Sequence, residues 1–254
     1  MQVHPLFKYP QSALDTLLAS IPFYKTVKAQ DEEQYELLMT FSRVIEYEAG
    51  EILARQSAED RWLYFMLRGQ MLVVKNEVDN AENESLDPST GTIISRINPG
   101  EVFGDMAFFL RQNAEKGKPN APNPDRKHSP VRVVADPDAS KILLFGTNML
   151  VFGRLHDFKR IKLSTKLAYY RNAVHNLRWK LEMFRAGHPD VSFADEHRQV
   201  KMYLGEKDTL VELENLHEQA VQLSICVVRW NRELNKRSDE EEGQLDVQAL
   251  QSLD

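Results

Sequence analysis

Short β-type segments follow one another between residues 41 and 145, separated by glycine, proline and acidic residues. The segments are Arg43–Gly50, Glu51–Ala54, Trp62–Leu67, Gln70–Val74, Thr92–Ile97, Val131–Ala135 and Lys141–Phe145. Strands this short, with glycines at the corners between them, favour an antiparallel barrel or sandwich. Because helical patterns lie on both sides of this region, we expect an α+β fold.

The residues before the β-type region follow a helical pattern. Leu14, Leu17 and Leu18 are spaced as on one helix face, just before Ile21–Tyr24. Asp31–Met39 begins with acidic residues, which favour a helix start because the helix N-terminus carries partial positive charge. We therefore expect the first 45 residues to be helical.

The carboxy-terminal third contains a long helix with one apolar seam. The seam residues recur in steps of four and three, the heptad pattern, and are Leu163, Leu167, Tyr170, Val174, Leu177, Leu181 and Phe184. We expect this helix to end at Gly187, because Pro189 lies just beyond it.

A second long helix is expected after a linker. Thr209 and Glu212 have the spacing of a capping box, which satisfies free N–H groups at a helix start. Its seam consists of Leu213, Leu216, Ala220, Leu223, Val227, Trp230 and Leu234. Val221, Ile225 and Val228 form a second apolar stripe, so this helix should be buried between two neighbours.

These patterns divide the chain into four parts. Residues 1–155 would hold N-terminal helices and a β-roll, 156–187 a dimerisation helix, 188–237 a C-terminal helical region, and 238–254 a disordered acidic tail. The predicted fold is α+β: an antiparallel barrel or sandwich with N-terminal helices, followed by long C-terminal helices in a bundle or coiled coil. The family resemblance given below implies that the β part is a jelly-roll-like β-roll.

Composition limits the class of protein. The 254 residues carry a net charge of −6, which disfavours general binding to nucleic acid. We expect neither a membrane span nor a signal peptide, because no apolar run is long enough for either. The single Cys226 excludes an intramolecular disulfide and fits a reducing compartment, so we expect a cytoplasmic protein.

Two segments together suit one class of ligand. Pro99–Phe109 contains a glycine turn, a carboxylate and small residues that open a short helix, which leaves backbone N–H groups free. Ser129–Ala135 supplies a cation, Arg132. Free N–H groups and a guanidinium bind phosphate, and a carboxylate accepts a hydrogen bond from a ribose hydroxyl. The pattern therefore indicates a phosphate diester fused to a ribose.

The two segments resemble the phosphate-binding cassette of cyclic-nucleotide-binding domains, in particular the CRP/FNR-type bacterial effector domain. The resemblance covers about residues 20–185 and includes Trp62–Gln70, which looks like the strand and glycine turn that these β-rolls carry before the cassette. It implies a cyclic nucleotide as the ligand, cyclic AMP ahead of cyclic GMP or another cyclic nucleotide, and no metal.

The resemblance also implies the binding residues. They are Phe103, Gly104, Asp105, Met106, Ala107, Arg132, Val133, Tyr170, Arg171 and Val174. The turn and the backbone after it would approach the cyclic phosphate, and Arg132 would form an ion pair with it. Asp105 stands where the family has a longer glutamate for the ribose 2′-hydroxyl, and Val133 offers only its backbone. Tyr170 would stack on the base, although a tyrosine on a heptad seam also suits the core of a dimer.

The cassette departs from the family pattern in ways that leave an alternative open. Residues 111–129 interrupt it with prolines and basic residues, as an irregular segment that would cover the ligand, contact a partner or be a passive insertion. With Asp105 in place of glutamate, a ligand-blind β-roll scaffold is the alternative, in which Arg132 pairs with a nearby acid.

The usual output of the family is missing. The chain has no recognisable helix-turn-helix, and the second long helix begins with acids that would repel DNA: Glu206, Asp208, Glu212, Glu214 and Glu218. No metal-ligand spacing or catalytic motif is present, so we expect no enzyme. We expect a receptor that contacts a protein effector; a CRP-like transcription regulator with an atypical DNA-binding surface is a further alternative.

Basic residues flank the seam of the first long helix, namely Lys159, Lys166, Arg171, Arg178, Lys180 and Arg185. In a parallel two-stranded coiled coil they would face like charges, so an acidic neighbour is needed unless this face is simply solvated. The second helix and a partner protein are the two candidates. We expect a homodimer through helix 156–187, with the second helices folded back to complete a bundle of four.

Overall fold

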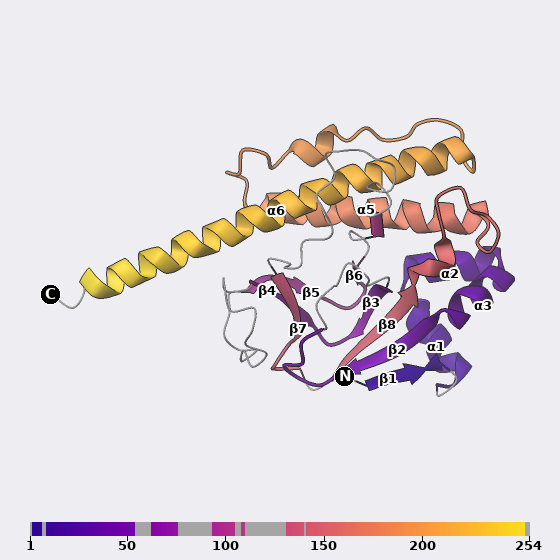
Figure 1. The fold of residues 1–254 in the computed structure, drawn as a ribbon, viewed down its shortest axis with the longest axis horizontal. Coiled ribbons are helices and arrows are strands. Elements are labelled where there is room, and N and C mark those ends of the chain that lie inside the picture. Colours follow the sequence, from indigo (N-terminus) through magenta and orange to yellow (C-terminus); the bar gives the residue numbers. More distant parts are fainter. Residues whose placement is uncertain are drawn as a thin grey trace.

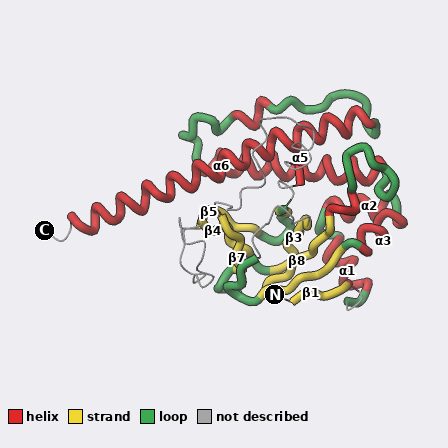
Figure 2. Tube along the Cα trace, viewed as in Figure 1, coloured by secondary structure: helices red, strands yellow, loops and turns green. Residues whose placement is uncertain are grey.

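Two antiparallel sheets lie beneath two long helices that run side by side (Figures 1 and 2). The structure is a computed structural model that describes residues 2–6, 9–53, 62–75, 93–104, 108–109, 131–139 and 141–251. The expected antiparallel α+β fold with long C-terminal helices is confirmed.

The strands form one larger and one smaller sheet. They are β1 Gln2–Pro5, β2 Ser42–Tyr47, β3 Trp62–Arg68, β4 Met71–Lys75, β5 Ile93–Ile97, β6 Val102–Phe103, β7 Val131–Ala135 and β8 Ile142–Asn148. The five-stranded sheet has the order β1-β2-β8-β3-β6, and the three-stranded sheet has the order β5-β4-β7. Of the expected strand at 51–54, only an isolated bridge between Ile52 and Val134 is present in the described residues.

The two sheets share an apolar core. Its buried members come from both sheets and include Ile45, Tyr47, Tyr64, Met66, Met71, Ile97, Phe103, Ala135, Ile142 and Leu144. Because alternate residues of a strand point to opposite faces, the remaining apolar residues of the larger sheet face the helices instead. Val44, Leu63, Phe65 and Phe145 belong to that second core. The larger sheet is therefore buried on both faces.

The helices flank the larger sheet and cover it. They are α1 Gln11–Leu18, α2 Pro22–Gln30, α3 Glu32–Thr40, the 3₁₀ turn η2 Met149–Phe152, α5 Leu163–Gly187, the 3₁₀ turn η3 Glu196–Gln199 and α6 Leu210–Gln251. The acid-started helix is confirmed, because the Asp31 side chain caps α3 by accepting a hydrogen bond from the Gln34 N–H at 3.1 Å. The stop of α5 at Gly187 is also confirmed.

Two predictions about the ends of the chain are wrong. The first residues are not helical throughout, since β1 pairs antiparallel with β2 at the edge of the larger sheet. A four-residue edge strand has too few residues to show a pattern, and its Pro5 is tolerated because it lies at an edge. At the other end, α6 continues to Gln251 through residues that we expected to form a disordered tail. Glutamate, glutamine and leucine, which dominate there, are good helix formers.

The seams of α5 and α6 pack against each other. Arg171 of α5 contacts Glu212 of α6, and further along Phe184 contacts Trp230, so the two helices run in the same direction. The seam residues of α6 from Leu213 to Leu234 are all buried. The second stripe is covered only in part, because Val221 is buried whereas Ile225 is exposed, so the expectation that α6 is enclosed on two faces is wrong at Ile225.

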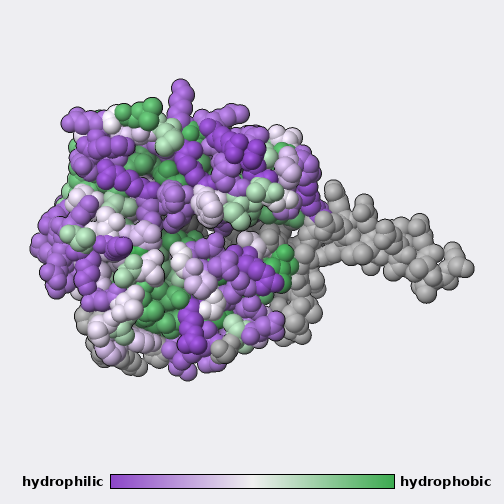
Figure 3. All heavy atoms as spheres, turned by 180° about the vertical axis from the view of Figure 1, so that it is seen from behind, coloured by the Kyte–Doolittle hydropathy of each residue, from purple (hydrophilic) through white to green (hydrophobic). Residues whose placement is uncertain are grey.

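The linker between the long helices runs back along α5, as a parallel connection requires (Figure 1). From behind, polar residues cover most of the surface and apolar residues interrupt it in places (Figure 3). None of the helices in the described ranges combines the length and the apolar character needed to cross a membrane.

Candidate functional site

The first half of the predicted cassette is attached to strand β3. The Gly100 N–H donates to the Met66 carbonyl at 2.8 Å, and the Met66 N–H donates to the Glu101 carbonyl at 2.9 Å. The two residues of β6 then pair with β3, and the ring of Phe103 stacks on that of Tyr64 with centroids 5.1 Å apart. The segment before the turn is therefore fixed by backbone hydrogen bonds and one aromatic stack.

Gly104 makes the turn that the cassette needs. Its φ is +93°, in the region that favours glycine. A Cβ at this position would lie 2.5 Å from the carbonyl oxygen of Trp62 at the start of β3. Both the backbone conformation and the close approach to β3 exclude a side chain, so the sequence places glycine here for two separate physical reasons.

The short helix after the turn connects the cassette to α5. Phe108 and Phe109 are helical, and Phe109 is fully buried. Its ring stacks on Tyr169 at 5.9 Å and is tilted against Tyr170 at 5.5 Å. Three residues of the predicted site, Asp105, Met106 and Ala107, lie outside the described residues, so their roles stay predictions. The inserted segment 111–129 also lies outside them.

The second half of the cassette lies on the smaller sheet. β7 pairs with β4, and the backbone of Arg132 lies opposite Val74. Along β7, Val133 packs against the core between the sheets, whereas Val134 joins Leu72 and Val74 in a separate cluster. The side chain of Arg132 is outside the described part, so its ion pair with a phosphate stays a prediction.

Tyr170 and Val174 lie in the interface between α5 and α6. Both are buried, and the ring of Tyr170 meets that of His217 from α6 edge to face at 5.7 Å. Burial raises the pKa of the Tyr170 hydroxyl above its ordinary value. The core that buries Tyr170 is formed with α6 of the same chain and not with a second subunit, which corrects the dimer-core interpretation. Base stacking by this ring stays a prediction.

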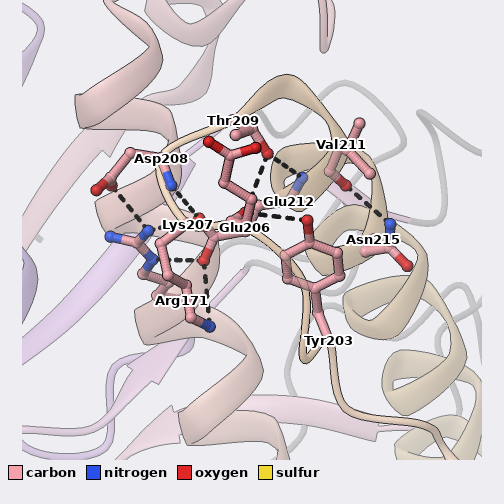
Figure 4. A network of polar contacts seen from close by, with 9 residues as sticks. All are labelled: Arg171, Tyr203, Glu206, Lys207, Asp208, Thr209, Val211, Glu212 and Asn215. Carbon is pink, nitrogen blue, oxygen red and sulfur yellow. Dashed lines mark hydrogen bonds and ion pairs between the residues drawn. The ribbon is translucent and has the colours of Figure 1, made fainter.

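Arg171 joins the start of α6 to α5 (Figure 4). Its Nε donates to Glu212 Oε1 at 3.0 Å and its Nη2 to Glu212 Oε2 at 2.6 Å, and Nη2 also reaches Asp208 at 2.9 Å. Glu212 is only 1% exposed. Burial alone would raise the pKa of Glu212, but the hydrogen bonds from Arg171 and the Asp208 N–H hold it below its ordinary value.

The same contacts complete the predicted cap of α6. The Glu212 N–H donates to the Thr209 hydroxyl at 3.1 Å, and the Asp208 N–H donates to the Glu212 carboxylate at 2.7 Å. The capping box between Thr209 and Glu212 is thus confirmed, with the return hydrogen bond made one residue earlier than in the standard motif. Asp208 adopts a φ of +61°, which directs its backbone into this turn.

Acidic and polar groups of the same chain lie against the basic flank of α5. Besides Arg171, Arg178 donates to the Val200 carbonyl at 2.8 Å and Arg185 pairs with Asp195 at 2.5 Å. Lys166 is buried and donates to the carbonyls of residues 154 and 155 at 2.6 and 3.1 Å. Of the two acidic neighbours considered from the sequence, the second helix is the one that Arg171 contacts.

A polar clamp on the linker was missed by sequence reasoning. His197 is buried, with its Nε2 3.0 Å from Glu182 of α5 and its Nδ1 3.1 Å from the Ala194 carbonyl. Arg198 makes two further hydrogen bonds to Glu182, each 2.8 Å long. Hydrogen bonds from Arg198 and His197 lower the pKa of Glu182 to about 2. Within the described ranges, no group of three or more His, Cys, Asp or Glu residues could hold a metal ion.

Comparisons with known proteins find similarity only among solved structures. No protein-family profile and no curated protein matches the chain. The regulatory domain of Toxoplasma gondii PKA, co-crystallised with cAMP, matches with 14% identity over 63% of this chain and 48% of that chain, with a TM-score of 0.38. The match thus spans about half the length of that protein.

Two bacterial structures match as well. The N-terminal domain of a transcriptional regulator from Streptomyces coelicolor matches with 15% identity over 65% of this chain and 94% of that chain, with a TM-score of 0.39. A cyclic nucleotide-binding-like protein from Brucella abortus matches with 14% identity over 54% and 91%, with a TM-score of 0.33. All three matches are weak in both sequence identity and TM-score.

The two left-handed glycines of the cassette test the turn. We expect Gly100→Ala to lower the free energy of unfolding by about 1 kcal/mol, because only its φ of +90° is strained and no atom lies within 4 Å. Gly104→Ala should cost about 3 kcal/mol, since its Cβ also meets the Trp62 carbonyl. Urea unfolding followed by circular dichroism measures both, and equal losses would contradict the close contact at Gly104.

Substitutions of Arg171 and Arg185, which lie on the same helix, give a matched comparison that tests the α5–α6 contact. Arg171→Met leaves a buried carboxylate, that of Glu212, without its main partner, and should lower the free energy of unfolding by about 3 kcal/mol. Arg185→Met removes an ion pair to Asp195, which is 65% exposed, and should cost less than about 1 kcal/mol. If urea unfolding gives the two variants equal stability, Glu212 does not depend on Arg171.

Proposed function

We propose that this chain is a cytoplasmic receptor for a cyclic nucleotide, with cyclic AMP as the ligand, and that it signals through contacts with a protein effector. The observation that supports this most strongly is the turn at Gly104. It follows strand β6, lies shortly before the helical residues Phe108 and Phe109, and has the positive φ of a glycine turn, the arrangement of a strand, a turn and a helix start in which free backbone N–H groups bind a phosphate. The proposal assigns the chain no catalytic residue and no metal.

The position of the cassette supports a signalling role. Phe109 packs on Tyr169 and Tyr170, and Tyr170 packs on His217 of α6. A ligand that moves the short helix after Gly104 would therefore displace rings that lie directly on both long helices. The signal would reach an effector as a change in the position of α5 and α6.

The surface of α6 favours a protein effector over DNA. Glu206, Glu214 and Glu218 are exposed at its first turns and just before them. Carboxylates on the leading face of a helix repel the phosphates of a duplex. The proposed function therefore does not include DNA binding, in agreement with the net charge of −6.

A ligand-blind scaffold is the second candidate, and one observation favours it. Tyr170, Arg171 and Val174, which the resemblance assigns to the base, are engaged with α6. If a nucleotide binds, either other residues contact its base or α6 has to shift. Ligand binding itself separates the two candidates.

The homodimer is proposed in a changed form. The seam of α5 that it would use is filled by α6 of the same chain. The opposite face of α5 carries Trp179, 62% exposed, and Met183, 56% exposed, with the uncharged Asn172 and Asn176 on the same side. An isologous interface brings a surface against its own copy, so a face without like charges suits self-association. The four helices of two chains would then complete the expected bundle.

Calorimetry with cyclic AMP, cyclic GMP and a cyclic dinucleotide tests the receptor. We expect micromolar or tighter binding of cyclic AMP, at least about tenfold weaker in Arg132→Ala because a charge-assisted ion pair to phosphate is lost. Arg96→Ala, a partly exposed arginine on the same sheet, should bind as the unaltered chain does. Absence of binding for all three nucleotides would favour the ligand-blind scaffold.

Light scattering after size-exclusion chromatography tests the dimer. We expect a particle with twice the 29.4 kDa chain mass, and Trp179→Glu should convert it to a monomer because the charge would face its own copy. Leu204→Glu is the control, since Leu204 is 89% exposed on the linker and lies off this face. A monomeric unaltered chain, or a Trp179→Glu variant that stays dimeric, would contradict this interface.

A further inference from the structure

Arg43 lies on the inward face of the larger sheet. Along β2, Ile45 and Tyr47 belong to the core between the two sheets, whereas Val44 belongs to the core beneath the helices. Ser42 also faces the helices, because its hydroxyl donates to the Leu38 carbonyl at 2.8 Å. By strand alternation Arg43 shares the face of Ile45. A cation on the inside of a roll is costly unless a partner compensates it.

An aromatic platform holds the guanidinium of Arg43. Its Cζ lies 3.7 Å from the centroid of the Trp62 ring, within the range of a cation–π interaction. Gly146 of β8 pairs with Arg43 on one side and with Tyr64 on the other. A Cβ on Gly146 would lie 3.2 Å from the Trp62 ring and 3.4 Å from the Tyr64 ring. The absence of a side chain at Gly146 thus leaves room for the Trp62 ring beside Arg43.

The charge of Arg43 has no partner of opposite sign in the described part of the chain. No ion pair forms between Arg43 and a described carboxylate, and its Nε is buried without a hydrogen bond. Stacking on the indole offsets part of the desolvation but satisfies none of the N–H groups, because they point along the plane of the guanidinium. Buried donors without acceptors are rare in native proteins and call for an explanation.

The arginine lies next to the cassette. Arg43, Gly146, Tyr64 and Phe103 face one another across four adjacent strands, and Gly104 follows Phe103 directly. The carbonyl of Trp62, whose ring carries Arg43, is also the group that the Gly104 turn approaches. A phosphate that approaches Gly104 would therefore lie near the platform. Arg132, in contrast, belongs to the smaller sheet.

We propose that Arg43 binds the phosphate of the nucleotide, as a second cation besides Arg132 and one that Trp62 holds in place. The proposal rests on the proposed function, since it concerns the same ligand. A guanidinium stacked flat on an indole keeps its N–H edge free, and that edge matches two oxygens of one phosphate. The phosphate would thereby neutralise a charge for which the described residues supply no partner of opposite sign.

The experiment compares a charged and an uncharged ligand on matched variants. Binding of cyclic AMP and of adenosine is measured by calorimetry for the unaltered chain, Arg43→Gln, Arg43→Lys and Arg68→Gln, an exposed arginine at the far end of β3. We expect Arg43→Gln to weaken the binding of cyclic AMP about 10- to 100-fold while the binding of adenosine is unchanged. The affinity of Arg43→Lys for cyclic AMP should lie between those of the unaltered chain and Arg43→Gln, because lysine keeps the charge and loses the planar stack. Arg68→Gln should have no effect.

The outcomes separate this proposal from the receptor itself. If Arg43→Gln binds cyclic AMP as tightly as the unaltered chain, Arg43 is not a phosphate ligand and the receptor proposal stands. If Arg43→Gln does not fold, the ratio of cyclic AMP to adenosine affinity in Arg43→Lys decides, and an unchanged ratio overturns the proposal.

If the unaltered chain binds no nucleotide, the receptor proposal fails and inorganic phosphate decides the question for Arg43. Titration is followed by tryptophan emission, with Trp62→Phe to identify the contribution of Trp62. A change that disappears in both Trp62→Phe and Arg43→Gln supports an anion site at Arg43. No change in the unaltered chain overturns it.

Discussion

The apolar seam of α5 has to be covered, and the way α6 covers it determines the C-terminal half of the molecule. Because the two helices are parallel, the chain has to return along the whole of α5 before α6 can begin. The linker is held on that path by the buried His197 and by Arg198, which both contact the carboxylate of Glu182. Arg171 then fixes the first turn of α6. A seam that suited a second subunit is thus filled within one chain.

The sequence predicted most of the elements and the residues that begin and end them. Thr209 and Asp31 act as caps, and Gly187 ends its helix, because these effects depend on a few neighbouring residues. The partner of the seam could not be predicted in the same way. A heptad pattern states that a helix needs a neighbour, and it is the same whether that neighbour comes from another subunit or from residues 41 positions further on, as Glu212 is from Arg171.

The candidate site shows the same division. Gly104 was predicted because it is the glycine turn of the cassette motif, and the structure adds the φ of +93° and the Trp62 carbonyl as the reasons why no other residue fits. Arg43 was not singled out, since Val44 and Ile45 beside it are both apolar and buried on opposite faces. Where a sheet is covered on both sides, the alternation of apolar and polar residues is lost, and with it the signal for which face a charge occupies.

The contacts at the two sides of α5 differ in kind, and this difference bears on how a signal would travel. Toward α6 and the linker, the contacts include directional hydrogen bonds such as those of Arg171 and Glu182, which fix distance and angle. Toward the cassette, the contacts of Phe109 with α5 in the described residues are between aromatic rings and include no hydrogen bond. α5, the linker and α6 would therefore move as one unit on the cassette. Because Phe109, Tyr169 and Tyr170 are all buried, a displacement of Phe109 would be passed on to the two tyrosines and so to this unit.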